Sequence, residues 1–193
     1  MRSPDRDDHS REGDPADHLL VRAARLGDAD AFDQIVRRHG PGMYRYALRM
    51  VGGDASDAGE IVQEAFVSAW KDISAFEARS SLKTWLYRLL SRRAVDLQRK
   101  RKPTPVDDDF LTVVAPPARH DPLQAVMDGE LLAALQGALA ELPWEQRAVW
   151  LLREVEEMSY GEIAAALSMT SDGVRGLLHR GRKNLAERME PWR

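Results

Sequence analysis

The sequence contains no cysteine among its 193 residues. This absence excludes disulfide bonds, thiolate zinc sites and cysteine nucleophiles. Long apolar runs are also missing, because no stretch approaches the ~20 residues that a membrane helix needs. The first ten residues, MRSPDRDDHS, are charged where a signal peptide would be apolar. We therefore expect a cytoplasmic protein without membrane insertion.

Motifs of common enzyme classes are missing too. The sequence has no HExxH metal motif, no GxxxxGK(S/T) phosphate loop and no GxSxG nucleophile elbow, and its five histidines are scattered singly. An enzyme is thus an alternative that no motif supports. We expect no catalytic residue, no metal site and no cofactor.

The chain is rich in helical periodicity and shows neither strand-like alternation nor an internal repeat. Residues 16–102 divide into amphipathic segments, the first predicted as one helix over 19–32, and helices resume over 121–193. Residues 103–120 hold four prolines and three consecutive aspartates, which predicts a flexible linker. Residues 1–15 are polar and predict a disordered tail. The predicted fold class is all-α, with two small helical domains joined by the linker.

The two signs of charge are segregated along the chain, although the net charge is only −3. Residues 78–102 carry nine basic side chains and one acid, Asp96, a local charge of +8. Such a concentration is typical of a phosphate-binding surface. Residues 54–64 hold four acids and no base. The acidic and basic segments are expected to form different surfaces.

Helical-wheel positions divide the acidic segment into two faces. The apolar side holds Val62, Ala65, Phe66, Ala69, Trp70 and Ile73, and the opposite side holds Asp57, Glu60, Glu64 and Ser68. Spacing alone favours an ordinary amphipathic helix with a solvated acidic face. The same face is also suited to docking a basic partner.

The basic segment has an apolar stripe formed by leucines 82, 86, 89, 90 and 97. Arg88, Arg92 and Arg99 lie in a line well off this stripe, with the spacing needed to follow a nucleic-acid backbone. Phe76, Trp85 and Tyr87 are candidates for base stacking. Trp85 lies beside the apolar stripe, which favours a place in the core.

The C-terminal segment predicts a helix-turn-helix. Ser159 and Glu162 open its first helix as a capping box, and residues 168–170 make the turn. The second helix is expected to bury Val174, Leu178, Gly181 and Leu185, and to expose Asp172, Arg175, Gly176, His179 and Lys183. Its exposed face is a candidate for major-groove contacts.

Three ordered motifs resemble the extracytoplasmic-function sigma factors. They are DAGEIVQEAFVSAW at 57–70, SSLKTWLYRLL at 80–90 followed by AVDLQRKRK, and LPWEQRAVWLLREVEEMSYGEIAAAL at 142–167. The resemblance implies a factor that directs RNA polymerase core to promoters and helps to open the DNA. It also implies a minimal two-domain architecture, with sigma region 2 over 16–102 and sigma region 4 over 121–193.

The resemblance further implies a role for each surface. The acidic helix would contact polymerase core, made of the beta and beta-prime subunits, through Asp57, Glu60, Gln63 and Glu64. The minus-10 promoter element would be read by Phe76, Arg79, Ser80, Lys83, Arg88, Arg92 and Arg99. The minus-35 element would be read by Thr170, Ser171, Asp172, Arg175, His179 and Arg182. An anti-sigma factor is a further expected partner.

The sequence departs from the family pattern at several positions. Gly59 replaces an acid of the acidic helix, and Gly173 and Leu177 replace a threonine and an arginine of the last helix. Ser168 replaces the turn glycine that tolerates a positive φ.

Two further alternatives remain. A stand-alone helix-turn-helix regulator would leave the acidic and basic helices unexplained, and a helical adaptor would leave the local charge of +8 without a partner.

Overall fold

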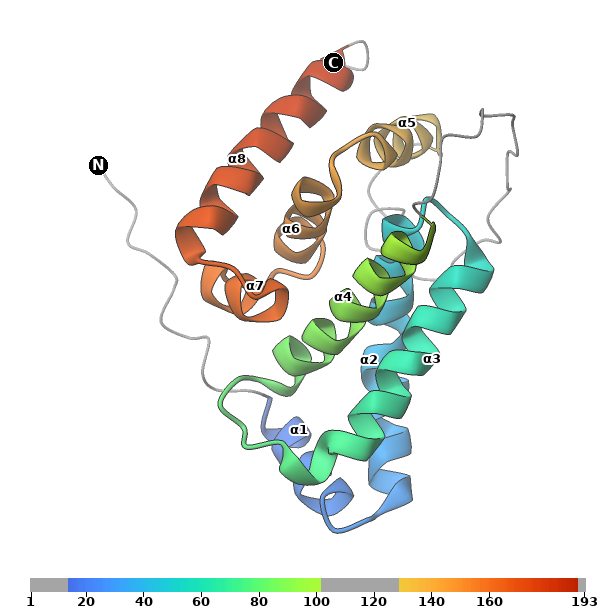
Figure 1. Cartoon of the computed structure of the whole chain (residues 1–193), viewed down its shortest axis with the longest axis vertical. Coiled ribbons are helices and arrows are strands. Elements are labelled where there is room, and N and C mark those ends of the chain that lie inside the picture. The colour runs from blue at the N-terminus through green and yellow to red at the C-terminus, as the bar shows by residue number, and fades with distance from the viewer. Residues whose placement is uncertain (1–13, 102–128, 191–193) are drawn as a thin grey trace.

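The computed structural model describes residues 14–101 and 129–190 (Figure 1). Within these ranges the chain forms helices and no strand, which confirms the all-α class. Residues 1–13 of the predicted tail and the predicted linker over 103–120 lie outside the described residues, whereas Pro15, at the end of the predicted tail, begins a helix. The helices are α1 (Pro15–Ala24), α2 (Ala29–Met50), α3 (Ala55–Asp72), α4 (Leu82–Arg101), α5 (Gly129–Ala140), α6 (Trp144–Glu154), α7 (Tyr160–Leu167) and α8 (Ser171–Arg188), with a 3-10 turn, η1 (Ile73–Ala75), after α3.

The prediction of one helix over 19–32 is wrong, because the helix is interrupted at a turn that contains Gly27. This glycine has a φ of +90°, a conformation that side chains with a Cβ rarely adopt. Asp28 then starts α2, since its carboxylate accepts a hydrogen bond from the backbone N–H of Ala31 at 3.0 Å. The same residues that read as one periodic segment therefore form the end of α1 and the start of α2.

Helices α1 to α4 pack around the first part of the core. Ile35, Met43 and Tyr46 of α2 are fully buried, as are Leu86 and Leu90 of α4. The rings of Tyr46 and Tyr87 meet edge to face, with centroids 5.5 Å apart. Burial raises the pKa of both phenols well above their usual value, so both stay neutral.

Helices α5 to α8 form the second part, in which α6 and α7 pack against α8. The predicted inward residues of α8 are all buried: Val174, Leu178, Gly181 and Leu185. Gly181 lies where α6 crosses α8, and a Cβ there would come within 3.4 Å of the Gln146 carbonyl. The inward face of α8 is thus as the sequence predicted.

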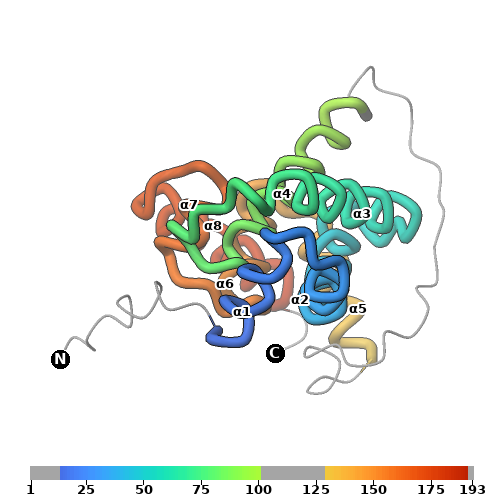
Figure 2. Tube along the Cα trace, turned by 90° about the horizontal axis from the view of Figure 1, so that it is seen from below, coloured from blue at the N-terminus to red at the C-terminus, as the bar shows by residue number. Residues whose placement is uncertain are grey.

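The two parts are in contact in this structure. Helix α4 lies between α3 on one side and α7 on the other (Figures 1 and 2). Helix α2 also contacts α5 and α6. The basic helix of the first part is therefore packed along one side by the first helix of the helix-turn-helix.

Candidate functional site

A row of exposed arginines runs along α4. Leu82, Leu86 and Leu90 hold the opposite side of the helix in the core, which leaves Arg88, Arg92 and Arg99 on the surface. Residues four and eleven positions after Arg88 return to nearly the same side of an α-helix, and eleven residues rise ~16 Å. The row can therefore present positive charge to several consecutive phosphates of a strand.

The loop before α4 differs from the expectation in one respect. Phe76 is buried and stacks on Trp85, with ring centroids 4.8 Å apart at 36°. In this conformation its ring is not exposed for base stacking, because it serves the core beneath the loop. Arg79 is exposed and pairs with Glu77 at 2.5 Å, while the hydroxyl of Ser80 donates to the carbonyl of Ser81.

The first turn of α4 is engaged by the second part of the chain. Lys83 Nζ donates a hydrogen bond to the backbone carbonyl of Glu156 at 2.6 Å and lies 3.3 Å from its carboxylate. The hydroxyls of Ser81 and Thr84 bond Glu162 Oε1 at 3.4 and 3.3 Å. The other carboxylate oxygen of Glu162 accepts the backbone N–H of Ser159 and so completes the predicted capping box of α7.

Helix α3 exposes three of its four predicted contacts with polymerase core. Glu60, Gln63 and Glu64 lie on the surface. The expectation that Asp57 shares this solvated face is wrong, because Asp57 is only 8 % exposed. Asp54 caps α3 by accepting the backbone N–H of Asp57, which brings Asp57 into the first turn of the helix, close to the core.

An apolar groove lies beside these acids, between α2 and α3, with a volume of about 570 Å³. Trp70, on the apolar side of the helical wheel, is 41 % exposed at this groove, next to Val67, which is 48 % exposed. The edge of the Trp70 ring meets Phe32 with centroids 4.9 Å apart. The apolar surface of α3 is wider than the stripe that its neighbours cover.

The helix-turn-helix forms as predicted. Ser168 ends α7 with a φ of +56° and a ψ of +46°, the left-handed conformation that the family's turn glycine accommodates. Thr170 caps α8 by accepting the backbone N–H of Gly173 at 3.1 Å. Asp172, Arg175, His179 and Lys183 are exposed along α8, and Gly176 is half-buried.

Three charged residues of the predicted minus-35 set have side-chain partners within the chain. Asp172 accepts a hydrogen bond from Arg175 at 2.8 Å. The Arg175 guanidinium also lies over the Tyr160 ring, 5.4 Å from its centroid. Arg182 is directed to α6, where it donates two hydrogen bonds to Glu154 Oε1 at 3.0 and 2.6 Å. Ser171 is half-buried at the start of α8.

The described ranges hold neither a candidate metal site nor a candidate membrane span. No cluster of three or more His, Cys, Asp or Glu side chains there has the geometry of a metal site. None of the helices in those ranges is both long and apolar enough to cross a membrane.

Both parts of the chain match known protein families. Residues 35–104 match Sigma-70 region 2, and residues 132–185 match Sigma-70, region 4. The ECF RNA polymerase sigma factor SigW of Bacillus subtilis strain 168 is 31% identical over 177 residues, which cover 88% of this chain and 94% of SigW. The chain belongs to the ECF sigma factor family. It therefore directs RNA polymerase to promoters, and the resemblance in its motifs is confirmed.

Solved structures support the same fold for this ECF sigma factor. CnrH, solved in complex with the cytosolic domain of CnrY, is 27% identical with a TM-score of 0.69, over 91% of this chain and 98% of CnrH. The sigma factor RpoE of Bartonella quintana, solved with the anti-sigma factor NepR, is 22% identical with a TM-score of 0.64, over 82% of this chain and 96% of RpoE, which shows the fold.

Sequence analysis did not predict the contacts that join the two parts of this sigma factor. Glu156 and Glu162 contact Lys83 and Thr84 from more than 70 positions away along the chain. Arg147 donates to the Met50 carbonyl at 3.1 Å and to the Leu142 carbonyl at 3.2 Å. No local pattern predicts such pairs. What the sequence does show is that Glu156, Glu162 and Arg147 are charged residues in segments with apolar neighbours.

Proposed function

We propose that the exposed row on α4 holds the DNA backbone at the minus-10 element. The single observation that carries this assignment is the position of Arg88, Arg92 and Arg99 on one exposed side of α4. Backbone contacts position a protein on DNA, whereas base contacts give it specificity. Arg79, Ser80 and Lys83, at the N-terminal end of the same helix, are the polar groups nearest to an opened strand.

Helix α3 supplies the contact with polymerase core in this proposal. Glu60, Gln63 and Glu64 are exposed next to the apolar groove that contains Val67 and Trp70. An apolar centre flanked by charge is the usual anatomy of a protein interface. Asp57 is left out of this contact surface because it is buried.

Helix α8 is assigned to the minus-35 element. The N-terminal end of a recognition helix normally contacts base edges in the major groove. Thr170, Ser171, Asp172 and Arg175 lie at that end of α8, and His179 follows two turns later. Arg182 is engaged by Glu154 and is better suited to holding α8 on α6 than to reading DNA.

Regulation by an anti-sigma factor is part of the proposal. The sigma factor RpoE of Bartonella quintana was solved with the anti-sigma factor NepR, and CnrH was solved with the cytosolic domain of CnrY. The protein would act in the cytoplasm, where promoters and polymerase are found, and by binding without catalysis.

Transcription from a promoter library tests the proposal. Purified polymerase core should start RNA at a defined set of promoters only when the full chain is added. The stand-alone regulator predicts the opposite pattern, with specific binding of promoter duplex by the free chain and no dependence on it for initiation. That pattern would overturn the assignment.

A further inference from the structure

The contact between the two parts of the chain involves Lys83 of the proposed DNA surface and two hydroxyl residues next to it. Lys83, Ser81 and Thr84 open α4, and all three bond Glu156 or Glu162 of the second part. The Glu156 side chain is only 10 % exposed. Oxygen atoms of Glu156 and Glu162 thus occupy donors at the start of α4, among them the Lys83 ammonium that a DNA phosphate would otherwise bind.

Besides Lys83, two further residues lie against the Glu156 carboxylate. Its carboxylate is beside the Tyr87 hydroxyl and helps to raise the pKa of that phenol. On α2 it approaches Gly42, where a Cβ would come within 3.5 Å of Glu156 Oε2. Helices α2 and α4 therefore enclose the Glu156 carboxylate together.

A second contact point lies at the far end of the interface. Arg147 of α6 donates to the last carbonyls of α2, those of Arg49 and Met50, and to the Leu142 carbonyl. Partial burial lowers the pKa of this guanidinium, and the carbonyl oxygens provide its hydrogen bonds. Arg147 thereby links the C-terminal end of α2 to the second part.

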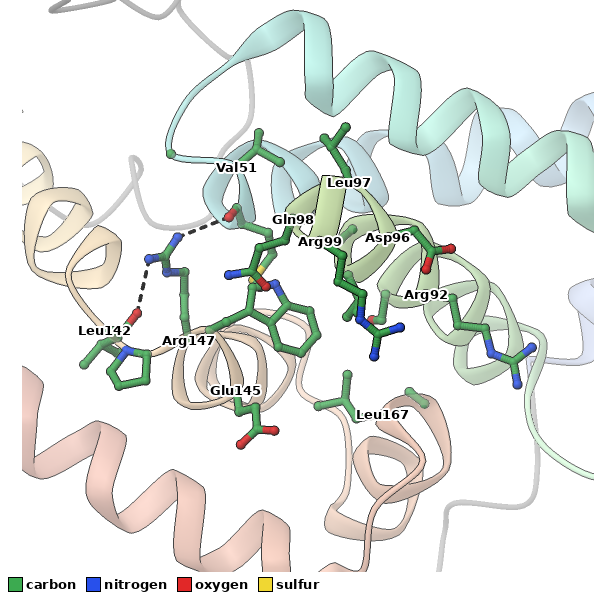
Figure 3. Close-up of a pocket in the computed structure, with 18 of the residues that line it drawn as sticks. Val51, Arg92, Asp96, Leu97, Gln98, Arg99, Leu142, Glu145, Arg147 and Leu167 are labelled. Carbon is green, nitrogen blue, oxygen red and sulfur yellow. Dashed lines mark hydrogen bonds between the residues drawn. The ribbon is translucent and has the colours of Figure 1, made fainter. Parts of the chain in front are cut away.

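A groove of about 1190 Å³ runs next to Arg147, between α4 and the second part (Figure 3). Arg92 and Arg99 line it from α4, while Glu145 and Leu167 line it from α6 and α7 (Figure 3). The interface is therefore not closely packed along its whole length. An interface with polar anchors and a large open groove is weak enough to separate.

The distance between promoter elements requires such a separation. Elements named for positions 10 and 35 are about 25 base pairs apart, which is ~85 Å of duplex. A compact chain of this length has a radius of gyration of about 16 Å, so it cannot reach both. The 27 residues from 102 to 128 can span at most ~90 Å when fully extended, which is enough to connect two separated domains.

We propose that the free sigma factor is held closed by Glu156 and Glu162, which occupy the first turn of α4 in place of DNA. Promoter binding requires this contact to break, so the two carboxylates inhibit the factor from within. The inhibitory role rests on the proposed DNA surface, whereas the closed conformation itself does not.

Distance measurements on the full chain test the closed conformation. The absence of native cysteine lets Asp30→Cys on α2 and Ala186→Cys on α8, both exposed, carry a pair of spin labels. The parent should give one narrow distance distribution. Glu156→Lys places a like charge beside Lys83 and should give a broad, longer distribution. Adding Lys83→Glu restores opposite charges and should restore the narrow one.

Glu157→Lys is the matched control, because it makes the same change of charge at the exposed neighbouring residue. Its distance distribution should match that of the parent. Glu156→Gln keeps the shape of the side chain and replaces Glu156→Lys should the latter fail to fold, as judged by circular dichroism. A broad distribution in the parent, or a narrow one in both Glu156 variants, would overturn the closed state.

Binding to polymerase core tests the inhibitory role. The Glu156→Lys chain should bind core or open a promoter about threefold to tenfold more readily than the parent and Glu157→Lys. Equal activity despite separated domains would overturn the inhibition alone. If no variant acts with core, the proposed function fails together with the inhibition, while the distance result still decides the closed state.

Discussion

Arg93 of α4 joins the two charged surfaces of the first part, since its guanidinium bonds Ser68 Oγ at 2.8 Å and lies 3.6 Å from the Glu64 carboxylate. Both charged side chains are more than 40 % exposed, so the ion pair contributes little to stability. The acidic surface of α3 and the basic row of α4 therefore adjoin at one edge while their other members stay exposed. Each surface can be changed separately.

The acidic surface is tested by Glu60→Lys combined with Glu64→Lys. We expect loss of binding to polymerase core, because the charge at the proposed contact is reversed. The free energy of unfolding should change by less than ~1 kcal/mol, since both side chains are exposed. Pull-down of core and thermal unfolding measure the two quantities. Glu130→Lys with Glu190→Lys makes the same change elsewhere and should bind normally, whereas normal binding of the first variant would contradict the assignment.

The basic row is tested by Arg88→Ala combined with Arg92→Ala. Promoter opening should weaken while core binding persists, because backbone contacts to DNA are lost. Each lost phosphate contact should reduce the slope of log affinity against log salt by about 0.7 to 0.9. Titration of holoenzyme on promoter DNA at several salt concentrations gives this slope. Two exposed arginines, Arg22 of α1 and Arg25 directly after it, provide the control pair. An equal loss in that pair would argue for a general charge effect.

The turn of the helix-turn-helix is tested by Ser168→Gly. The left-handed conformation costs a residue with a Cβ ~1 to 2 kcal/mol in the folded state, and glycine avoids this cost. The greater conformational freedom of glycine in the unfolded chain offsets part of that gain. We expect a net gain of about 0.5 to 1 kcal/mol in the free energy of unfolding, seen in chemical denaturation. Ser171→Gly, in the first turn of α8, should instead be neutral or destabilising. A loss of stability for Ser168→Gly would show that the turn is not strained.

The pH dependence of stability is tested at His39. Burial lowers its pKa below the ordinary 6.5, although Asp17, 3.2 Å away, opposes this; Arg38 and Lys83 lower it further. The unfolded chain therefore binds more protons just below pH 6.5. The free energy of unfolding should fall as the pH drops from 6.5 towards the lower pKa of the folded state. Above pH 6.5 the contribution of His39 to the free energy of unfolding should be fully present.

His39→Gln removes the titrating group, so its free energy of unfolding should depend less on pH across that window. Urea denaturation at a series of pH values measures the difference. His179→Gln, on the exposed face of α8, should behave as the parent does. Identical slopes for the parent and His39→Gln would rule out this linkage.

Local features of the fold were predictable because they depend on neighbours in the sequence. The capping box of Ser159 and Glu162 and the inward face of α8 follow from a helical repeat of 3.6 residues. The break at Gly27 was missed, because the helical pattern continues across it and only the backbone conformation reveals the turn.

The limits of the helical wheel appear on α3 and in the loop before α4. A wheel places residues around one helix but does not say how much of the circumference its neighbours cover. Asp57 is buried and Trp70 is partly exposed for this reason. Phe76 was a candidate for stacking on bases, but the Trp85 ring next to it forms the stack within the protein.

The amino-acid sequence by itself determined the helical class, the segregated charges and the family, because periodicity, composition and motif order are properties of consecutive residues. Only the tertiary structure decided the partners of Lys83 and Arg147, which lie far away in the chain and meet only when the two parts pack. Long-range pairing depends on the sum of many weak contacts, and no single stretch of residues encodes that sum.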